Sequence, residues 1–309
     1  MHEFASGSRL RLTCPAKVNL ALSVGPPRGD GLHPIASWMV ALDFADTLTL
    51  KRLEPGDASR FHAAYDPTSP VAKEIDWSRE KDLAWRAYLA LCETARRELP
   101  CAIELGKRIP TGGGLGGGSS DAAAVLVGVD RLFALALGRE RLLELAMRLG
   151  SDVAFLVEAV LGRGSALVTG TGEAIEASQL RKPLHLTLVI PPFGCPTGAV
   201  YRAFDQRAGI AALDEARVRQ MINSDQLTGD QLFNDLEAPA IAVDPRLGEL
   251  LQNLRAVLDG EPRVTGSGSV CYALAESRAA ADAAARRVRD ELGVAAIGTS
   301  NVGGRERRR

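Results

Sequence analysis

The chain reads PTGGGLGGGSSD from Pro110 to Asp121, and an apolar, helix-forming run from Ala122 to Val129 follows this glycine stretch. Glycine allows positive φ angles and a close approach of the backbone to a ligand. A helix that begins at the serines would direct unpaired N–H groups and the positive end of its dipole into the stretch. We therefore predict a phosphate-binding loop. A flexible linker is the less favoured alternative, because linkers are not usually followed directly by a strongly helical segment.

The type of phosphate-binding loop is constrained by what the stretch lacks. It has no Gly-Lys-Ser/Thr ending, so it is not a P-loop. Gly112, Gly114 and Gly117 match the dinucleotide spacing, but that motif also requires a strand after the helix that ends in an acidic residue. Here a second helical pattern, Glu140 to Leu149, follows with no strand between. Nicotinamide binding is therefore the minority interpretation.

The composition argues against several classes of protein. A net charge of −1 over 309 residues argues against nucleic acid or a membrane surface as the main partner. No apolar run is long enough to span a bilayer, and the first residues lack the charged start and apolar core of a signal peptide. The five cysteines are scattered and the four histidines are isolated, which predicts free thiols, a reducing cytoplasmic location and no site for a transition metal.

The residues before the glycine stretch show strand and helix patterns. Ser37 to Leu42 and Thr47 to Leu53 predict two strands joined by a turn around Asp46. Lys81 to Leu99 has an apolar stripe at helical spacing. Cys101 to Ile109 predicts a strand that leads directly into the glycines.

A domain boundary is expected near residues 178–182. Beyond it, strand and helix patterns alternate, beginning with the buried-type strand Leu184 to Ile190. We predict an α+β fold of two domains. The N-terminal domain, residues 1–178, contains a mixed β-sheet with helices, and the C-terminal domain, residues 179–309, is an α/β sandwich.

Two charged residues stand out from their surroundings. Lys17 lies in an apolar, extended segment, Pro15 to Leu20, where burial of an unpaired ammonium is costly. A lysine that extends from a strand edge to solvent is an equally good interpretation of Lys17 taken alone. Asp152 follows Gly150, which ends a helix, and an N-cap is the favoured interpretation of this aspartate taken alone.

Four stretches together, in this order and spacing, resemble the GHMP small-molecule kinases. They are Pro15 to Leu20, Gly112 to Ala123, Gly150 to Phe155 and Thr265 to Ser269. Smaller motifs resemble the branch of that family that acts on a cytidine diphosphate derivative of methylerythritol. These are Gly29 to His33, Lys107 to Pro110, Val168 to Glu173, Pro196-Thr197 and Asn234 to Glu237. The resemblance covers nearly the whole chain, from about residue 11 to residue 296.

The resemblance implies a two-domain kinase with its active site in the cleft between the domains. It implies transfer of a phosphoryl group from ATP, with Mg²⁺, to the 2-hydroxyl of methylerythritol in the non-mevalonate isoprenoid pathway. It makes Asp152 the catalytic base, with Lys17 beside it to favour the carboxylate and steady the developing charge. The residues expected to bind ATP are Pro110, Gly112, Gly113, Gly114, Leu115, Gly116, Gly117, Gly118, Ser119 and Ser120. A serine hydroxyl is expected near Mg²⁺, and the protein is expected to be a monomer or homodimer.

The resemblance also implies a site for the cytidyl substrate. Its expected residues are Asn19, Asp30, Leu32, His33, Thr197 and Tyr201. The family usually has an aromatic residue where this chain has Leu32, so one stacking contact with the cytosine, worth about 1–3 kcal/mol, is forgone. Weaker or altered nucleotide specificity is therefore expected. Asp121, where an asparagine is frequent, is a second and milder departure.

Alternative functions stay open at this point. A homoserine, mevalonate or sugar kinase would share Lys17, the glycine stretch and Asp152 only in part, and would lack the loop from Asp30 to His33. A non-catalytic nucleotide-binding protein of the same fold is the alternative from another class. The presence of both Lys17 and Asp152 argues against it.

Overall fold

The computed structural model describes residues 4–71, 74–207 and 212–302. The chain divides into two compact units, which are described one at a time. Unit 1 comprises Met1–Ala16, Phe44–Ile109 and Gly116–Arg163. Unit 2 comprises Lys17–Asp43, Pro110–Leu115 and Gly164–Arg309. Each unit is assembled from three separate segments of the chain. The predicted boundary between residues 178 and 179 would instead divide the chain into two continuous domains, and it stays a prediction.

Strands β1 (Arg9–Val24) and β2 (Ile35–Arg52) contribute residues to both units. The prediction of a turn around Asp46 is wrong, because β2 continues through this residue. Asp46 is fully buried, and its carboxylate accepts backbone N–H groups from the end of a neighbouring strand. These partners are 62 and 63 residues away along the chain, so the local sequence did not reveal them.

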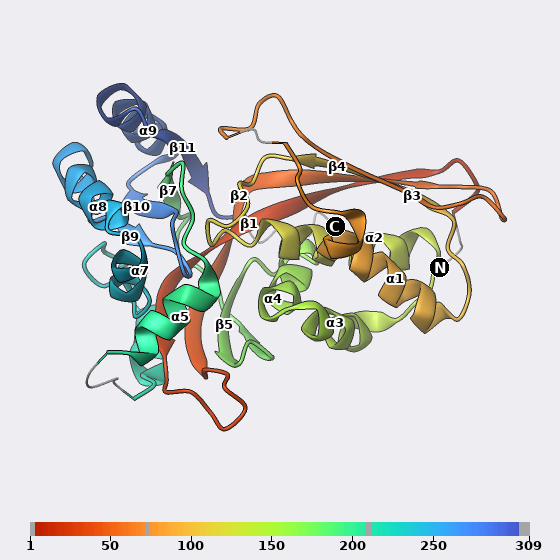
Figure 1. Ribbon diagram of the computed structural model, residues 1–309, viewed down its shortest axis with the longest axis horizontal. Coiled ribbons are helices and arrows are strands. Elements are labelled where there is room, and N and C mark those ends of the chain that lie inside the picture. Colours follow the sequence, from red (N-terminus) through yellow and green to blue (C-terminus); the bar gives the residue numbers. More distant parts are fainter. Residues whose placement is uncertain (1–3, 72–73, 208–211, 303–309) are drawn as a thin grey trace. The chain divides into compact units, whose positions relative to one another are not determined.

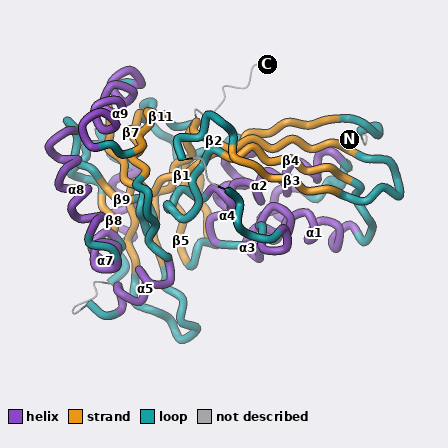
Figure 2. Tube along the Cα trace, turned by 45° about the horizontal axis from the view of Figure 1, so that its top comes forward, coloured by secondary structure: helices purple, strands orange, loops and turns teal. Residues whose placement is uncertain are grey.

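In unit 1, the second part of β2 forms a sheet with β4 (Cys101–Lys107) and β3 (Arg60–Tyr65). β4 pairs antiparallel with residues 47–52 of β2, and β3 pairs parallel with β4. The helical elements of this unit are η1 (Arg79–Lys81), α1 (Leu83–Ala95), α2 (Gly117–Leu132), α3 (Gly138–Leu149) and α4 (Ser151–Val160). Figures 1 and 2 show α1 to α4 gathered on one side of β3 and β4.

Helix α2 is the centre of unit 1. It is apolar on nearly all sides and packs against α1 and α4, and its residues from Ser120 to Asp130 are all buried. A Cβ atom at Gly128 would lie 2.6 Å from Leu50 and 2.9 Å from Leu12, so the missing side chain lets α2 approach the strands closely. The continuous helical run after the glycine stretch is thus explained by burial of the whole helix rather than of one face.

In unit 2, the first part of β2 pairs antiparallel with β5 (Ser165–Gly170), and β5 pairs with β6 (Ala174–Ala177). Residues 21–22 of β1 pair parallel with the short strand β8 (Phe233–Asn234). A second, antiparallel sheet has the order β11-β7-β10-β9. Its strands are β7 (His185–Ile190), β9 (Arg263–Val264), β10 (Cys271–Ala275) and β11 (Ala295–Ser300).

The helices of unit 2 pack on its strands and on one another. They are α5 (Thr197–Asp205), α6 (Glu215–Ile222), α7 (Glu237–Val243), α8 (Arg246–Val257) and α9 (Arg278–Leu292). α9 packs on β7, β10 and β11, and α8 lies beside α9 (Figure 1). The Thr187 hydroxyl in β7 donates to the Ala281 carbonyl in α9, which fixes helix to sheet. The predicted α+β class is confirmed.

Candidate functional site

The first half of the glycine stretch, Pro110–Leu115, belongs to unit 2 and packs on the loop from Thr265 to Ser269. The Val270 N–H donates to the Gly113 carbonyl at 3.2 Å. A Cβ at Gly113 would lie 2.7 Å from the Val270 side chain, and a Cβ at Gly114 would overlap the Thr265 carbonyl oxygen. Gly114 also has a φ of +82°. Gly114 is required because backbone meets backbone at a positive φ, and Gly113 because a side chain there would collide with Val270.

The second half of the stretch belongs to unit 1 and starts helix α2. Gly116 is the N-cap, with a φ of +71°, so the helix begins at Gly117, two residues before the first serine. The helix start lacks a capping side chain, which leaves N–H groups and the positive dipole end available to an anion. The Ser120 hydroxyl is buried and makes no hydrogen bond with any described residue. These features fit a phosphate-binding helix start.

Lys17 and Asn19 lie two residues apart on β1, so their side chains share one face of the strand. Lys17 is 3% exposed, and its ammonium donates to Asn19 Oδ1 at 2.8 Å. The lysine therefore does not extend from a strand edge to solvent. A Cβ at Gly266 would lie 3.4 Å from Lys17 Nζ, which places the ammonium against the loop from Thr265 to Ser269.

Asn19 anchors this part of unit 2 through several buried contacts. Its amide Nδ2 donates to the Ser37 hydroxyl at 2.7 Å, and its backbone N–H donates to the Thr265 hydroxyl at 3.0 Å. Its carbonyl accepts from the Tyr272 hydroxyl at 2.8 Å. Thr265 and Tyr272 were not predicted as site residues. The glycine-serine character of the Thr265 to Ser269 loop was the available signal for the first, and nothing in the sequence indicated the second.

Asp152 lies in unit 1, in the first turn of α4, where it is partly buried. Gly150 is the N-cap of this helix, so the N-cap interpretation of Asp152 is wrong. A carboxylate in the first turn of a helix is favoured by the helix dipole. Lys17 belongs to unit 2, and its predicted pairing with Asp152 stays a prediction.

The predicted cytidyl-binding residues lie in unit 2, and two of them are in ring contact. The His33 and Tyr201 rings have centroids 5.0 Å apart, tilted by 43°. His33 Nδ1 lies 3.0 Å from the Gly25 carbonyl oxygen, so this nitrogen carries a proton and donates. His33 Nε2 lies 3.4 Å from an Asp205 carboxylate oxygen. The ring is thus held in one orientation.

Asp30 and Leu32 lie on the turn before His33. Asp30 Oδ1 accepts from the Leu32 N–H at 3.0 Å, and Asp30 pairs with Arg28. The Leu32 hydrogen bond, and then the Arg28 contact, lower the pKa of Asp30. Leu32 is 54% exposed, so its side chain projects from the turn into solvent.

Thr197 begins α5 and contacts the loop from Thr265 to Ser269. Its hydroxyl lies 3.0 Å from the Ser267 hydroxyl. Asn234 Nδ2 donates to the carbonyls of Val264 and Gly266, each at 2.8 Å, and so holds the same loop. Unit 2 therefore brings together Lys17, Asn19, Thr197 and the first half of the glycine stretch around one loop.

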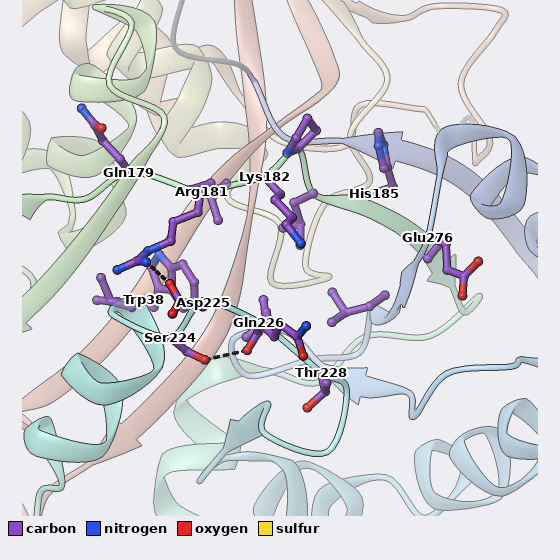
Figure 3. A pocket seen from close by; sticks show the side chains of 17 residues that line it. Trp38, Gln179, Arg181, Lys182, His185, Ser224, Asp225, Gln226, Thr228 and Glu276 are labelled. Atoms are coloured by element: carbon purple, nitrogen blue, oxygen red, sulfur yellow. Dashed lines mark hydrogen bonds and ion pairs between the residues drawn. The ribbon is translucent and has the colours of Figure 1, made fainter.

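A separate cavity of about 490 Å³ lies elsewhere in unit 2 (Figure 3). It is lined by Trp38, Ile222 and residues 179–185, 224–228 and 274–276, none of which was predicted as a site residue. Successive side chains of a strand point to opposite faces, and the Ser37 hydroxyl contacts Asn19. The cavity therefore lies on the opposite face of β2 from Asn19.

In the part of the chain that the structure describes, no three histidine, cysteine or acidic side chains gather as metal ligands would. Within the same residues, no helix has the length and apolarity needed to cross a membrane.

The chain matches two family models. The model of the GHMP kinases N terminal domain matches residues 82–159, and the model of the GHMP kinases C terminal domain matches residues 207–294. Among solved structures, a crystal structure of 4-(cytidine 5′-diphospho)-2C-methyl-D-erythritol kinase aligns with a TM-score of 0.77 and 32% identity. That alignment covers 96% of this chain and all of the other. A homoserine kinase from Cytophaga hutchinsonii aligns with a TM-score of 0.67 at 17% identity, which shows the shared fold alone.

Curated relatives agree with the structural match. The 4-diphosphocytidyl-2-C-methyl-D-erythritol kinase of Thermobifida fusca is 37% identical over 270 residues, which covers 85% of this chain and 86% of the relative. The enzyme of the same name from Caulobacter vibrioides is 37% identical over 292 residues, or 91% of this chain and 94% of the relative. The chain therefore belongs to the GHMP kinases and, within them, to the 4-diphosphocytidyl-2-C-methyl-D-erythritol kinase family.

Proposed function

We propose that the protein transfers the γ-phosphoryl group of ATP to the 2-hydroxyl of 4-(cytidine 5′-diphospho)-2-C-methyl-D-erythritol, in the non-mevalonate isoprenoid pathway. Membership of a kinase family makes it a small-molecule kinase, and the names of its relatives support this substrate. The observation that carries the proposal is the packing of the glycine stretch on the loop from Thr265 to Ser269, beside the buried Lys17 ammonium.

The triphosphate of ATP is assigned to the glycine stretch and the start of α2. Backbone N–H groups and the helix dipole there favour the negative charge of the phosphates. Phosphoryl transfer needs little covalent chemistry from the protein, so rigid donors around the phosphates account for much of catalysis. The contacts of Gly113 and Gly114 supply that rigidity on the unit 2 side.

The residues at the start of α2 are compatible with a Mg²⁺ ion that is bound mainly by phosphate oxygens. Mg²⁺ in kinases is commonly held by one or two protein oxygens together with the substrate phosphates, so a cluster of acids is not required. The buried Ser120 hydroxyl, which has no partner among the described residues, suits this role, with Ser119 as its neighbour. Bound Mg²⁺ would neutralise charge on the transferring phosphoryl group.

Asp152 is proposed as the base that accepts the proton of the 2-hydroxyl. Its carboxylate lies in the first turn of α4, and a carboxylate can accept a proton from an alcohol. Lys17 is proposed to steady negative charge as the phosphoryl group transfers. Its hydrogen bond to Asn19 fixes the direction of the ammonium within unit 2.

The cytosine is assigned to His33 and Tyr201. Nδ1 of His33 contacts the Gly25 carbonyl and Nε2 faces Asp205, so the ring is held beside Tyr201, and the Tyr201 ring is proposed to stack on the base. Leu32 would cover the base only by apolar contact, which is the basis for expecting weaker nucleotide specificity. The expected cytoplasmic location and the monomeric or dimeric state stay predictions.

A substrate comparison tests the proposal. Purified protein is incubated with ATP and Mg²⁺ together with the cytidyl methylerythritol substrate, homoserine or mevalonate, and ADP release is measured. We expect turnover with the cytidyl substrate and little above background with the other two. Turnover with homoserine or mevalonate instead would replace the proposed substrate. ATP binding without turnover of any alcohol would favour the non-catalytic alternative.

A further inference from the structure

Three buried charged residues of unit 1 join the two flanks of the glycine stretch. Asp46 lies in β2, Lys107 ends β4 and Asp121 lies in the second turn of α2. Their side chains are 0%, 3% and 3% exposed. The Lys107 ammonium donates to one carboxylate oxygen of Asp46 and to one of Asp121, so a single cation bridges two acids from different elements.

The same cluster binds the backbone where the chain enters the glycine stretch. Asp46 Oδ1 accepts the N–H groups of Arg108 and Ile109, the latter at 2.7 Å, and Pro110 follows directly. A Cβ at Gly117, the first residue of α2, would lie 2.9 Å from the Ile109 side chain. The entry to the stretch is therefore held against the start of the helix that follows it.

A contribution to the stability of the fold does not by itself explain why Asp46, Lys107 and Asp121 are buried together. A buried ion cluster is often no more stabilising than apolar residues of similar volume. Burial first, and then repulsion from Asp46, raise the pKa of Asp121 to about 7, although Lys107 opposes this. Burial alone would lower the pKa of Lys107, but the two carboxylates outweigh it and raise that pKa. The cluster carries an electrostatic cost that an apolar core would avoid.

We propose that Asp46, Lys107 and Asp121 are positioning residues that set the affinity of the protein for ATP. N–H groups bind phosphate more tightly when they already point at one place, because ordering a loop during binding weakens affinity. By fixing Arg108 and Ile109 on one side and Asp121 on the other, the cluster fixes both ends of the stretch. This inference rests on the proposed assignment of ATP to the glycine stretch.

A matched pair of variants tests the inference. Asp46→Ala removes the acceptor of two backbone N–H groups at the entry to the stretch. Asp130→Ala removes a buried carboxylate that accepts one backbone N–H, that of Leu137 at 3.0 Å, at the other end of α2. Both are expected to lower Tm. Only Asp46→Ala is expected to raise the Kd for ATP, by about 10-fold or more, with the KM for the alcohol substrate unchanged.

Isothermal titration calorimetry measures the Kd for ATP of each variant, and this value decides the test. If Asp46→Ala does not fold, Asp46→Asn carries the test, because it keeps the shape but turns an amide or a neutral oxygen toward Lys107, and a Kd at least several-fold higher is expected. A folded Asp46 variant with the Kd of the wild-type protein would overturn the inference, and so would an equal rise for Asp130→Ala. Wild-type protein that does not bind ATP would instead overturn the proposed function on which the inference rests.

Discussion

At the scale of single residues, the burial of Lys17 distinguishes between two interpretations of the sequence. An apolar strand can accommodate a buried lysine or a lysine that reaches solvent from the strand edge, so the sequence favoured neither. The structure buries the ammonium and gives it Asn19 as a partner, which accounts for a charge inside an apolar strand. The role of that charge in catalysis remains a proposal, as does the role of Asp152.

Asp152→Asn tests the proposed base. The substitution keeps the shape of the side chain but removes its capacity to accept a proton, so kcat is expected to fall roughly 10²–10⁴-fold. ATP affinity is expected to change little, since the triphosphate is assigned to the glycine stretch. Steady-state kinetics with the cytidyl substrate measure the first quantity and isothermal titration measures the second.

Glu140→Gln is the control for Asp152→Asn. Glu140 is also an acid in the first turn of a helix of unit 1, and nothing assigns it to the reaction. Both variants lose a favourable interaction with a helix dipole, but only Asp152→Asn is expected to lose turnover. A near-normal kcat for Asp152→Asn would remove this residue from the role of base.

The raised pKa of Asp121 predicts that the stability of the fold depends on pH. Its folded-state pKa, about 7, lies above its ordinary value of 3.8. Between these values the folded protein binds a proton that the unfolded chain does not, so this group stabilises the fold at low pH and the stabilisation is lost as pH rises through 7. The charged or titratable groups that act on it are Asp46 on β2, Lys107 on β4, Cys14 on β1 and Asp82 before α1.

Asp121→Asn removes this dependence. The Tm of wild-type protein minus that of Asp121→Asn is expected to fall as pH rises from about 5 to about 8, measured by thermal unfolding in buffers of equal ionic strength. Burial and the nearby acids hold the pKa of Cys14 well above its ordinary value, so its thiol does not contribute over this range. A difference in Tm that is constant with pH would show that Asp121 does not titrate there.

At the scale of elements, the glycine stretch was predictable because its conformation is encoded locally. Six glycines before an apolar run predicted a loop and a helix, and the structure has both, with α2 beginning at Gly117. The continuity of β2 was not predictable. Aspartate is common in turns, and the partners that keep Asp46 in a strand lie 62 and 63 residues away along the chain.

Gly114→Ala tests the packing of this element on its neighbouring loop. Alanine at a φ of +82° costs about 1–2 kcal/mol, and the added Cβ would overlap the Thr265 carbonyl. Gly293→Ala is the matched control, because Gly293 has a φ of +64° in the same unit and open space around it. Both variants are expected to lower Tm, but only Gly114→Ala is expected to weaken ATP binding, by about 10-fold or more by isothermal titration. Equal ATP affinities in the two variants would contradict the assignment of ATP to this loop.

At the scale of the whole molecule, the sequence predicted the fold class but not which segments of the chain form each compact unit. Alternating strand and helix patterns are local, and they gave the α+β class correctly. The compact units are assembled by contacts between distant segments, such as the hydrogen bond from Asn19 to Thr265, 246 residues apart. A boundary sought along the chain therefore could not show that residues 17–43 belong with residues 164–309. The pattern of Pro15 to Leu20 was recognised only through resemblance, because its partners lie so far away in sequence.

The cytidyl substrate and ATP are expected to bind different parts of the chain, and hydrogen exchange can distinguish the two binding sites. The residues assigned to cytidine, His33 and Tyr201, lie in the loop after β1 and in α5, whereas ATP is assigned to the glycine stretch and the start of α2. Cytidine diphosphate alone should therefore slow exchange in residues 25–34 and 197–205, since a ligand that binds the native state suppresses local opening there. ATP with Mg²⁺ should slow exchange in residues 110–121 instead. Helix α9, which carries no assigned residue, serves as the internal control. If cytidine diphosphate protected only residues 110–121, the glycine stretch would be its site and the assignment of cytosine to His33 and Tyr201 would be wrong.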